Sequence, residues 1–520
     1  MKKTLLFVSF AVAGAMNFVT LSALADGDTL EAAVSAARQF RQTHEFEILS
    51  EFRDLLRFPN NARNIDDMRE NAAFIRRIME ARGIKSELLE IAGAPPAIYG
   101  ELMQPQAELT LMIYIHYDGQ PTDLSRWKSD PFEPVVRAGR LEDGAEVIEF
   151  DSLKGRAIDS DWRLYARSAS DDKAPIIAVL AALDALAAAN MAPSVNLKIF
   201  LDGEEERGSP HLDAMIRKYK DKLESDFWLF LDGPQDQRGN ARVVLGARGI
   251  TGFELTVYGP ASGLHSGHYG NFSPNPIDRL VRLMASMRDA TGRVLIEGFY
   301  DEAEPLDAAT MSLIEAIPNA DAEIMRKIQV AGRESPGQRY EETILWPALN
   351  FRGIRSGGVG AEGRNIIEPS ATAAIGVRMV PKQTLEGIRG VVEAHIRAHG
   401  YHIVYEEPDV EIRLEHEKIA LVDWRGAGYP AVRTSPENPL AQRVIALMQA
   451  MTNNQTLIYP ILGGSLPLAH ITNNLDVPLV LVPMANQDNS QHAPNENIRI
   501  GHLWRGIEIY AGLLAAFDAD

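Results

Sequence analysis

Several short apolar runs in this chain end directly in acidic or histidine side chains. The runs "LTLMIYIHYD", "VNLKIFLDGEEE" and "DFWLFLD" have this form, and "VPLVLVP" is followed nine residues later by a histidine. Helical segments such as "DKAPIIAVLAALDALAAAN" separate the runs. Strands that alternate with helices form a mainly parallel sheet covered on both faces, with ligand sites at the carboxyl ends of its strands. The polar strand ends therefore predict a functional site at one edge of an α/β sheet.

The pattern changes after about residue 247. "GITGFELTVYGP" and "ATAAIGVRMVP" alternate like half-exposed antiparallel strands, and an acid-rich helical stretch lies between them. The first pattern then returns in "PLAQRVIALMQAM" and "VPLVLVP". Because a chain of 520 residues exceeds a comfortable single core, we expect at least two domains. We predict an α/β domain in two parts, 26–246 and 417–520, with an inserted α+β unit at 247–416.

The N-terminus has the layout of a secretory signal peptide. Lys2 and Lys3 precede an apolar stretch from about Leu5 to Leu24, and residues 23–25 fit a small-residue cleavage site. A membrane anchor is the alternative, but the Gly, Ala, Ser and Asn content of the stretch favours a signal peptide over residues 1–25. We expect cleavage after Ala25 and a periplasmic or secreted protein.

Composition excludes several functions. The net charge of −19 becomes −21 without Lys2 and Lys3, and so acidic a chain repels nucleic acid and anionic membranes, which are not expected partners. The sequence contains no cysteine, so disulfides and thiolate chemistry are excluded. Any metal must be held by His, Asp and Glu.

Acids and histidines gather at the predicted strand ends and before the Ala-rich helix: His116, Asp118, Asp171, Asp172, Glu204, Glu205, Glu206, Asp232 and His492. Taken singly, each has an ordinary explanation, since an aspartate before a helix caps it and a glutamate run is usually a solvated loop. Together, several like charges at adjacent strand ends are costly without a counter-charge. Two divalent ions would supply that charge. Histidine and carboxylate ligands suit zinc, with manganese or cobalt as alternatives.

Seven motifs carry a resemblance to a known family: "HYDGQP", "SASDDKAP", "EEERGS", "FLDGP", "GLHSGHYGN", "GGSLP" and "NSQHAPNENI". In order and spacing they resemble the zinc-dependent aminoacylase/carnosinase/carboxypeptidase family of metallopeptidases, over nearly the whole chain after residue 25. "GLHSG" and "GGSLP" resemble the carnosinase-like dipeptidase branch. The resemblance implies a dinuclear-metal exopeptidase in which the two-part α/β domain is catalytic. It also implies that the inserted unit at 247–416 is a dimerisation or lid domain, and hence that the protein is a homodimer.

The resemblance implies a ligand set for two ions. His116 and Asp232 would hold one ion, Glu206 and His492 the other, and Asp171 would bridge them. Asp118 would orient the ligating His116, as carboxylates beside ligating histidines typically do. The run of three glutamates permits a shift of one residue, and the following "RGS" aligns Glu205 and Glu206 with the family pattern.

The resemblance also implies catalytic and substrate-binding residues. Glu205 would be the general base that takes a proton from a metal-bound water. His265 would reach a neighbouring active site and stabilise the oxyanion, whereas His268 is the weaker candidate and His470 is expected to be structural. Arg378 and Ser465 would bind the substrate.

The sequence departs from the family pattern near the aspartate pair. The usual glycines are replaced by Ala166, Ser168 and Ala174, which changes the expected loop geometry. Residues 141–160 form an insertion of about 20 residues, which we expect to add a hairpin near the site entrance.

We predict a metal-dependent hydrolase that cleaves amide bonds of small peptides. An N-acyl-amino-acid deacylase or carboxypeptidase on the same scaffold is the nearer alternative. A non-enzymatic periplasmic binding protein is the alternative from another class, but it would need neither a proton shuttle nor metal ligands from five segments. A serine hydrolase is disfavoured, because "GGSLP" lacks the G-x-S-x-G nucleophile elbow.

Overall fold

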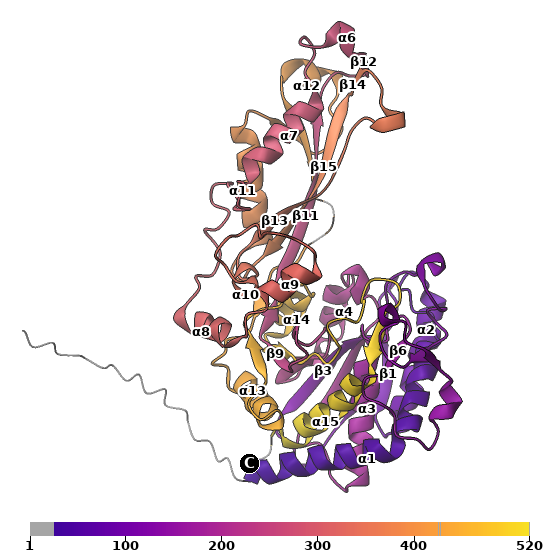
Figure 1. Ribbon diagram of the computed structural model, residues 1–520. Helices are drawn as coiled ribbons and strands as arrows, with labels where there is room; N and C mark the ends of the chain where they lie inside the picture. Colours follow the sequence, from indigo (N-terminus) through magenta and orange to yellow (C-terminus); the bar gives the residue numbers. More distant parts are fainter. Residues whose placement is uncertain (1–24, 425, 427, 519–520) are drawn as a thin grey trace, which may run out of the picture.

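The computed structural model describes residues 25–424, 426 and 428–518, so the predicted signal peptide lies outside the described residues except for its last position. A broad α/β region carries a narrower region that projects from it (Figure 1). Among the described residues, no helix combines the length and the apolar character needed to cross a membrane.

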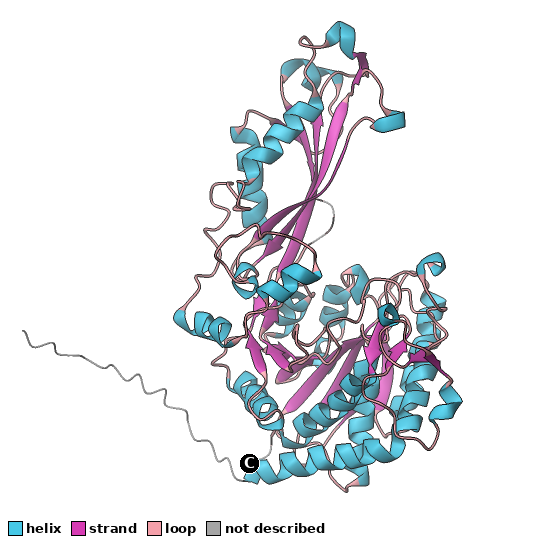
Figure 2. Ribbon diagram, in the orientation of Figure 1, coloured by secondary structure: helices cyan, strands magenta, loops and turns pink. Residues whose placement is uncertain are grey.

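An eight-stranded sheet forms the centre of the α/β region (Figure 2). In spatial order its strands are β1 (Lys85–Leu89), β2 (Ala97–Leu102), β7 (Asn196–Asp202), β3 (Thr110–His116), β8 (Phe227–Phe230), β20 (Leu479–Leu481), β9 (Arg242–Val244) and β19 (Leu457–Tyr459). The four middle strands, from β7 to β20, are mutually parallel. Antiparallel pairs lie to either side, at β1–β2, β2–β7 and β20–β9. The predicted α/β class is confirmed, and the parallel pairing is strongest at the centre.

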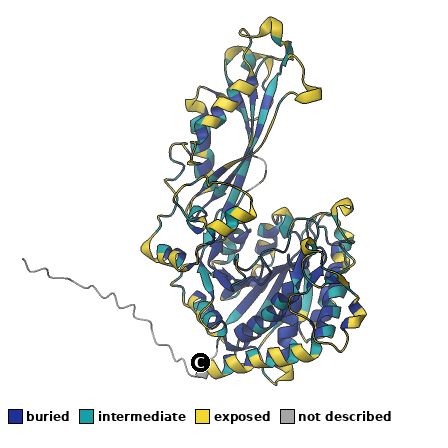
Figure 3. Cartoon of the chain, viewed as in Figure 1, coloured by how far each residue is buried: buried dark blue, intermediate teal, exposed yellow. Residues whose placement is uncertain are grey.

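Helices cover both faces of this sheet. One face packs against α1 (Ala25–Leu56), α2 (Ile65–Glu80), α3 (Lys173–Ala188), α13 (Pro439–Met451) and α15 (Ile500–Ala516). The other face packs against α4 (Leu212–Lys218), α5 (Lys220–Leu223) and α14 (Leu468–Leu475). The buried residues concentrate in the sheet and on the helix faces packed against it (Figure 3). Helix α3 is buried along most of its length, as its Ala- and Leu-rich sequence predicts.

A separate four-stranded antiparallel sheet joins the segment 135–165 to the C-terminal part of the chain. Its strands, in order, are β21 (Asn497–Arg499), β6 (Arg163–Tyr165), β4 (Val135–Arg137) and β5 (Val147–Ile148). Strands β4 and β5 are antiparallel neighbours, so the segment 141–160 contains the returning strand of a hairpin. Short helical turns at Leu141–Asp143 and Phe150–Leu153 complete this segment.

The projecting region contains a five-stranded sheet, with strands in the order β13 (Ala348–Arg355), β15 (Ser370–Met379), β11 (Gly249–Tyr258), β17 (Ile419–Asp423) and β16 (His402–Val404). Helices α7 (Pro276–Met287) and α11 (Leu385–Ala398) share a hydrophobic core with this sheet. Strand β17 pairs with β11, although it lies beyond the predicted domain end at residue 416. The sheet of this region therefore extends to residue 423.

The far end of the projecting region carries a two-stranded ladder of β12 (Leu264–His265) and β14 (Ile366–Ile367), followed by α6 (Ser266–Tyr269) and flanked by α12 (Val410–Glu415) (Figure 1). Nearer the α/β region, the acid-rich stretch forms α8 (Ala308–Ala316), α9 (Asp321–Lys327) and α10 (Tyr340–Thr343). A short ladder of β10 (Gly246–Ala247) and β18 (Val432–Arg433) lies where the chain passes between the two regions.

Candidate metal centre

The predicted ligands lie at the carboxyl ends of the central strands or, for Asp171, directly before helix α3. His116 is the last residue of β3, Asp232 follows β8, and Glu206 follows β7. Asp171 and Asp172 immediately precede α3, and His492 lies in the loop that follows β20. Parallel strands that end at one edge bring these five segments together, as the doubly covered sheet predicts.

Asp171, Glu206 and His492 form one group of possible metal ligands. The Nε2 atom of His492 lies 3.1 Å from Glu206 Oε2 and 3.2 Å from Asp171 Oδ2. Gln120 Nε2 donates to Glu206 Oε2 at 2.8 Å, and Gln491 Nε2 donates to Asp171 Oδ2 at 3.3 Å. The amides of Gln120 and Gln491 thus hold the two carboxylates of this group in place by hydrogen bonds.

His116, Asp172 and Asp232 form the second group. The other carboxylate oxygen of Asp171, Oδ1, lies 2.9 Å from His116 Nε2, so Asp171 presents one oxygen to each group. This is the arrangement expected of a bridging ligand. Asp172 is an addition to the predicted set: its carboxyl is buried, and Oδ1 has no hydrogen-bond partner among the described residues. Its position beside Asp171 in "SASDDKAP" was the available signal.

Asp118 supports both a ligand and the glutamate turn. Its Oδ1 lies 3.2 Å from His116 Nδ1, and its two oxygens accept from the backbone N–H groups of Glu205 and Glu206 at 3.1 Å each. A carboxylate in this position fixes the ring orientation of the histidine. It also holds the turn that presents Glu206, because backbone donors at both oxygens leave it little freedom.

Glu496 is a supporting residue that the sequence interpretation missed. It is completely buried, and its carboxylate accepts from the backbone N–H groups of Ser168, Ser170 and Asp171 at 2.9 to 3.0 Å. Arg167 Nη1 donates to it at 2.7 Å. Glu496 therefore ties the turn of Asp171 to the segment of His492. The signal was its place in "NSQHAPNENI", four residues after the histidine.

Electrostatics favour a cation in this place. Burial, together with repulsion from Asp171, raises the pKa of Asp232 to about 7. Burial also raises the pKa of Asp172 well above its ordinary value. Contacts with Asp171 and Glu206 raise the pKa of His492 to about 11. Several acids buried together hold charge poorly without a counter-charge, and divalent ions would provide it.

The donor set fits two divalent ions. Within each group the candidate ligand atoms all lie within 4.8 Å of one another, and the two groups share the Asp171 carboxylate. Imidazole nitrogen and carboxylate oxygen are ligands for zinc and for other first-row divalent metals. The orphaned Oδ1 atom of Asp172 adds an unused acceptor beside His116 and Asp232.

A cavity of about 450 Å³ opens onto these groups. Glu205, Arg378 and Ser465 line it together with Asp171, Glu206, Asp232 and His492. Burial raises the pKa of Glu205 well above its ordinary value, and the negative charge of Asp232 adds to the effect. Arg378 donates to the Ser465 hydroxyl, which in turn donates to the Gly249 carbonyl at 3.2 Å. The predicted base and the two predicted substrate-binding residues thus share one cavity with the ligands.

His265 is the one predicted site residue that a single chain leaves elsewhere. It lies in β12 at the far end of the projecting region, away from the large sheet (Figure 1). Its side chain is exposed and its ring centroid lies 4.5 Å from that of His268. His470 lies on α14, with its Nδ1 4.0 Å from Asp213.

Comparisons with known proteins identify the family of this chain. The model of the family described as "Peptidase family M20/M25/M40" matches residues 146–516 of this chain. The Cys-Gly metallodipeptidase dug1 of Schizosaccharomyces pombe is 23% identical over 431 residues, covering 80% of this chain and 81% of that protein. The human Beta-Ala-His dipeptidase is 24% identical over 424 residues, and the match covers 80% of this chain and 76% of that protein.

Solved structures show the same fold. The M20 family metallo-carboxypeptidase Sso-CP2 from Sulfolobus solfataricus superposes with a TM-score of 0.73 at 25% identity, covering 91% of this chain and 99% of that one. Human carnosine dipeptidase 1 superposes with a TM-score of 0.69 at 20% identity, and the match covers 93% of this chain and 99% of that one. Because the family match spans well over half of the sequence, this chain belongs to peptidase family M20/M25/M40.

Proposed function

We propose that this protein is a dinuclear metal-dependent dipeptidase, which hydrolyses the amide bond of small peptides. The observation that carries the proposal is the pair of ligand groups joined by Asp171, with Glu205 in the same cavity. The family match and the dipeptidases among its relatives support the activity. They do not favour the N-acyl-amino-acid deacylase alternative.

Each residue of the cavity has a proposed task. Bound divalent ions would supply a nucleophilic water at neutral pH and polarise the scissile carbonyl. Glu205 accepts the proton of the attacking water and delivers it to the leaving amine. Arg378, with its guanidinium beside the Ser465 hydroxyl, binds the carboxylate of the leaving amino acid. We propose zinc as the native metal, with manganese or cobalt as alternatives.

The test combines metal analysis with a substrate panel. The purified protein should contain about two divalent ions per chain, and a chelator should abolish hydrolysis of dipeptides. Replacement of Glu205 by Gln should lower kcat by about 10²–10⁴-fold without removing the metal. Activity on N-acetyl amino acids alone would contradict the dipeptidase assignment. Metal-dependent hydrolysis that survives E205Q would contradict the role of Glu205.

We propose that the protein acts as a homodimer in which a second copy brings His265 to the cavity. The exposed position of His265 supports this, because its own chain places it far from the ligands. The edge strand β13 and helix α7 expose Ile354 and Val281, which would suit a contact between copies. Light scattering should give twice the chain mass, and a monomeric active enzyme would contradict the proposal.

We propose further that the protein is exported after cleavage behind Ala25. The support is the sequence of residues 1–25, which has the charged start, the apolar stretch and the small-residue end of a signal peptide. Intact mass of the mature protein and its recovery from the periplasmic or secreted fraction test the proposal. An uncleaved chain in the membrane fraction would contradict it.

A further inference from the structure

A second cavity adjoins the metal cavity. It has a volume of about 380 Å³, and both cavities are lined by Gln237 and Gln487. Gln237 lies five residues after Asp232, and Gln487 lies five residues before His492. The loops that carry two of the proposed ligands thus also line this second cavity, at the place where the two meet.

The second cavity is rich in basic side chains. Five of them line it: Arg140, Arg163, Arg238, Lys327 and Arg499. The acidic lining residues are Glu323 and Asp488. This balance is the reverse of that of the whole chain, which has 52 basic and 71 acidic residues. An acidic protein therefore presents a locally positive cavity beside its proposed reaction centre.

Two of the basic side chains are engaged by the two acids. Arg163 is largely buried and pairs with Asp488 at 2.8 Å, and Arg238 pairs with Glu323 at 3.1 Å. These pairs anchor the walls: the first holds β6 against the loop after β20, and the second holds α9 against the loop after β8. Their charges are therefore largely matched.

Arg499 pairs with Asp161, so Lys327 and Arg140 remain as the available cations. Arg140 belongs to the loop of the β4–β5 hairpin, and its Nε forms ion pairs with Asp488 at 3.5 Å and with Glu142 at 3.6 Å, both longer than the Arg163–Asp488 pair. Lys327, at the end of α9, makes no ion pair or hydrogen bond with any residue that the structure describes. The Lys327 ammonium can thus turn to a ligand without breaking a pair, and the Arg140 guanidinium can do so by exchanging its two longer ion pairs for the ligand.

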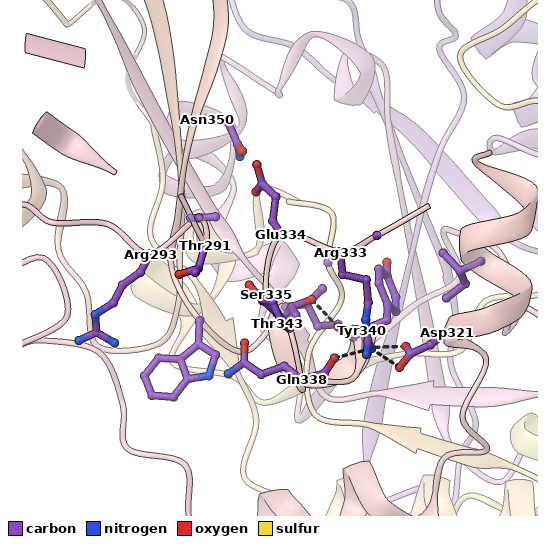
Figure 4. A pocket seen from close by; sticks show the side chains of 18 of the residues that line it. Thr291, Arg293, Asp321, Arg333, Glu334, Ser335, Gln338, Tyr340, Thr343 and Asn350 are labelled. Carbon is purple, nitrogen blue, oxygen red and sulfur yellow. Dashed lines mark hydrogen bonds and ion pairs between the residues drawn. The ribbon is translucent and has the colours of Figure 1, made fainter. Parts of the chain in front are cut away.

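A larger cavity that also adjoins the metal cavity differs from the 380 Å³ cavity in its charged lining. It has about 910 Å³, and Tyr340, Ile344 and Gly463 line both it and the metal cavity. There Arg333 pairs with Asp321 (Figure 4). Arg288 in the same hollow pairs with Glu334 at 2.8 Å. Arg248 and Arg293 also line the larger cavity, which is therefore positive as well. The smaller cavity is preferred as the anion site because it is lined by the loops that carry Asp232 and His492.

We propose that the 380 Å³ cavity binds a second carboxylate of the substrate, carried on the acyl side of the scissile bond. This inference rests on the proposed dipeptidase function and narrows its substrate class to dipeptides with an acidic N-terminal residue. Arg378 and Ser465, proposed for the carboxylate of the leaving amino acid, do not line this cavity. The acyl side is assigned to this cavity because Gln237 and Gln487, which line both cavities, belong to the loops that carry Asp232 and His492.

The test compares isosteric substrates in the metal-loaded enzyme. For the wild type we expect kcat/KM for Glu-Leu to exceed that for Gln-Leu by about tenfold, and the ratio to shrink at about 0.5 M salt. The double variant R140Q/K327Q should bring the ratio to about one and leave Gln-Leu hydrolysis unchanged. The matched control is Lys85→Gln, which removes an exposed lysine from the edge strand β1 and should retain the wild-type ratio.

Each contrary outcome is distinct. A wild-type ratio near one, or a preference that survives R140Q/K327Q, overturns the proposal. A preference for Leu-Glu over Leu-Gln that the double variant abolishes overturns the acyl-side assignment. Calorimetric titration of the E205Q variant with Glu-Leu and Gln-Leu measures the same preference without turnover. If neither dipeptide is hydrolysed by the wild type while that binding preference persists, the proposed function fails and the anion site stands.

Discussion

The metal centre and the tip of the projecting region differ in how much of their surroundings one chain provides. At the centre, His116 is completely buried, and its two ring nitrogens face Asp118 and Asp171. At the tip, His265 is exposed on a two-residue strand. A functional side chain needs supporting contacts to hold its geometry. The centre has them within one chain, whereas the tip would gain them only from another molecule.

Removal of the Asp171 carboxylate, which joins the two groups of proposed ligands, should produce the largest effect on the metal centre. Asp171→Asn leaves the shape nearly unchanged but removes the charge shared by the two ligand groups. We expect kcat/KM to fall by about a thousandfold or more, with fewer than two ions retained per chain. Metal analysis, activity assays and thermal melting check this. A folded D171N protein with two ions and normal activity would show that Asp171 does not bridge them.

His265→Ala tests the other side of the comparison. We expect kcat to fall by about 10²–10³-fold, because an oxyanion donor is lost, while metal content and thermal stability stay unchanged. When H265A and E205Q chains are mixed and allowed to exchange, random pairing should restore about a quarter of the wild-type activity, since one site in each mixed dimer is then complete. Mixtures that stay inactive despite demonstrated exchange would place His265 outside the partner's site.

Glu496→Gln measures how far the centre depends on its supporting contacts. The variant keeps the shape but replaces a charged acceptor of three backbone N–H groups by an amide. We expect metal affinity to fall by about 10–100-fold, with a smaller change in kcat once the enzyme is saturated with metal. Competition with a chelator gives the affinity. Glu437→Gln, at an exposed position before α13, is the control and should bind metal like the wild type.

The smallest predicted effect concerns His502, a buried residue of helix α15, and the pH dependence of the free energy of unfolding. Burial lowers its pKa from 6.5 to about 4, and its Nδ1 lies 2.9 Å from the Met484 carbonyl. Since the unfolded chain takes up this proton near pH 6.5 and the folded chain only near pH 4, stability falls as the pH drops between these values. The loss amounts to at most about 3 kcal/mol.

Urea unfolding at a series of pH values checks this prediction. The His502→Asn variant should lose less stability than the wild type between pH 6.5 and pH 4, whereas H265A should follow the wild type. Identical pH dependence for wild type and H502N would mean that His502 is protonated alike in the folded and unfolded chains.

Much of the architecture was accessible from the sequence because the strands of the large sheet are short and strongly patterned. Runs such as β3 and β8 are buried on both faces, and their polar ends mark one edge of the sheet. The same pattern placed His116, Asp232 and Glu206 at that edge before any geometry was known. It also grouped Asp171, before the Ala-rich helix, and His492, beyond its strand, with these residues, and the family resemblance then supplied the ligand roles.

Other features depend on contacts between distant segments. Glu496 acquires its role because it meets the turn of Asp171 more than 300 residues away, and no local pattern encodes that meeting. The end of the projecting sheet was placed too early because β17 is identified by its pairing with β11 rather than by its own five residues. Arg140 and Lys327 look like ordinary surface residues until the fold brings them to one cavity.

The contact between Glu496 and the Asp171 turn has a consequence for the order in which the protein matures. The ribosome releases His116, Asp171, Glu206 and Asp232 first, then the projecting region, and only at the end His492, Glu496 and α15. Until those last residues emerge, the turn lacks the acceptor of its three N–H groups, and α1 and α3 lack their neighbour α15. A chain that lacks residues 492–516 is therefore without a complete site.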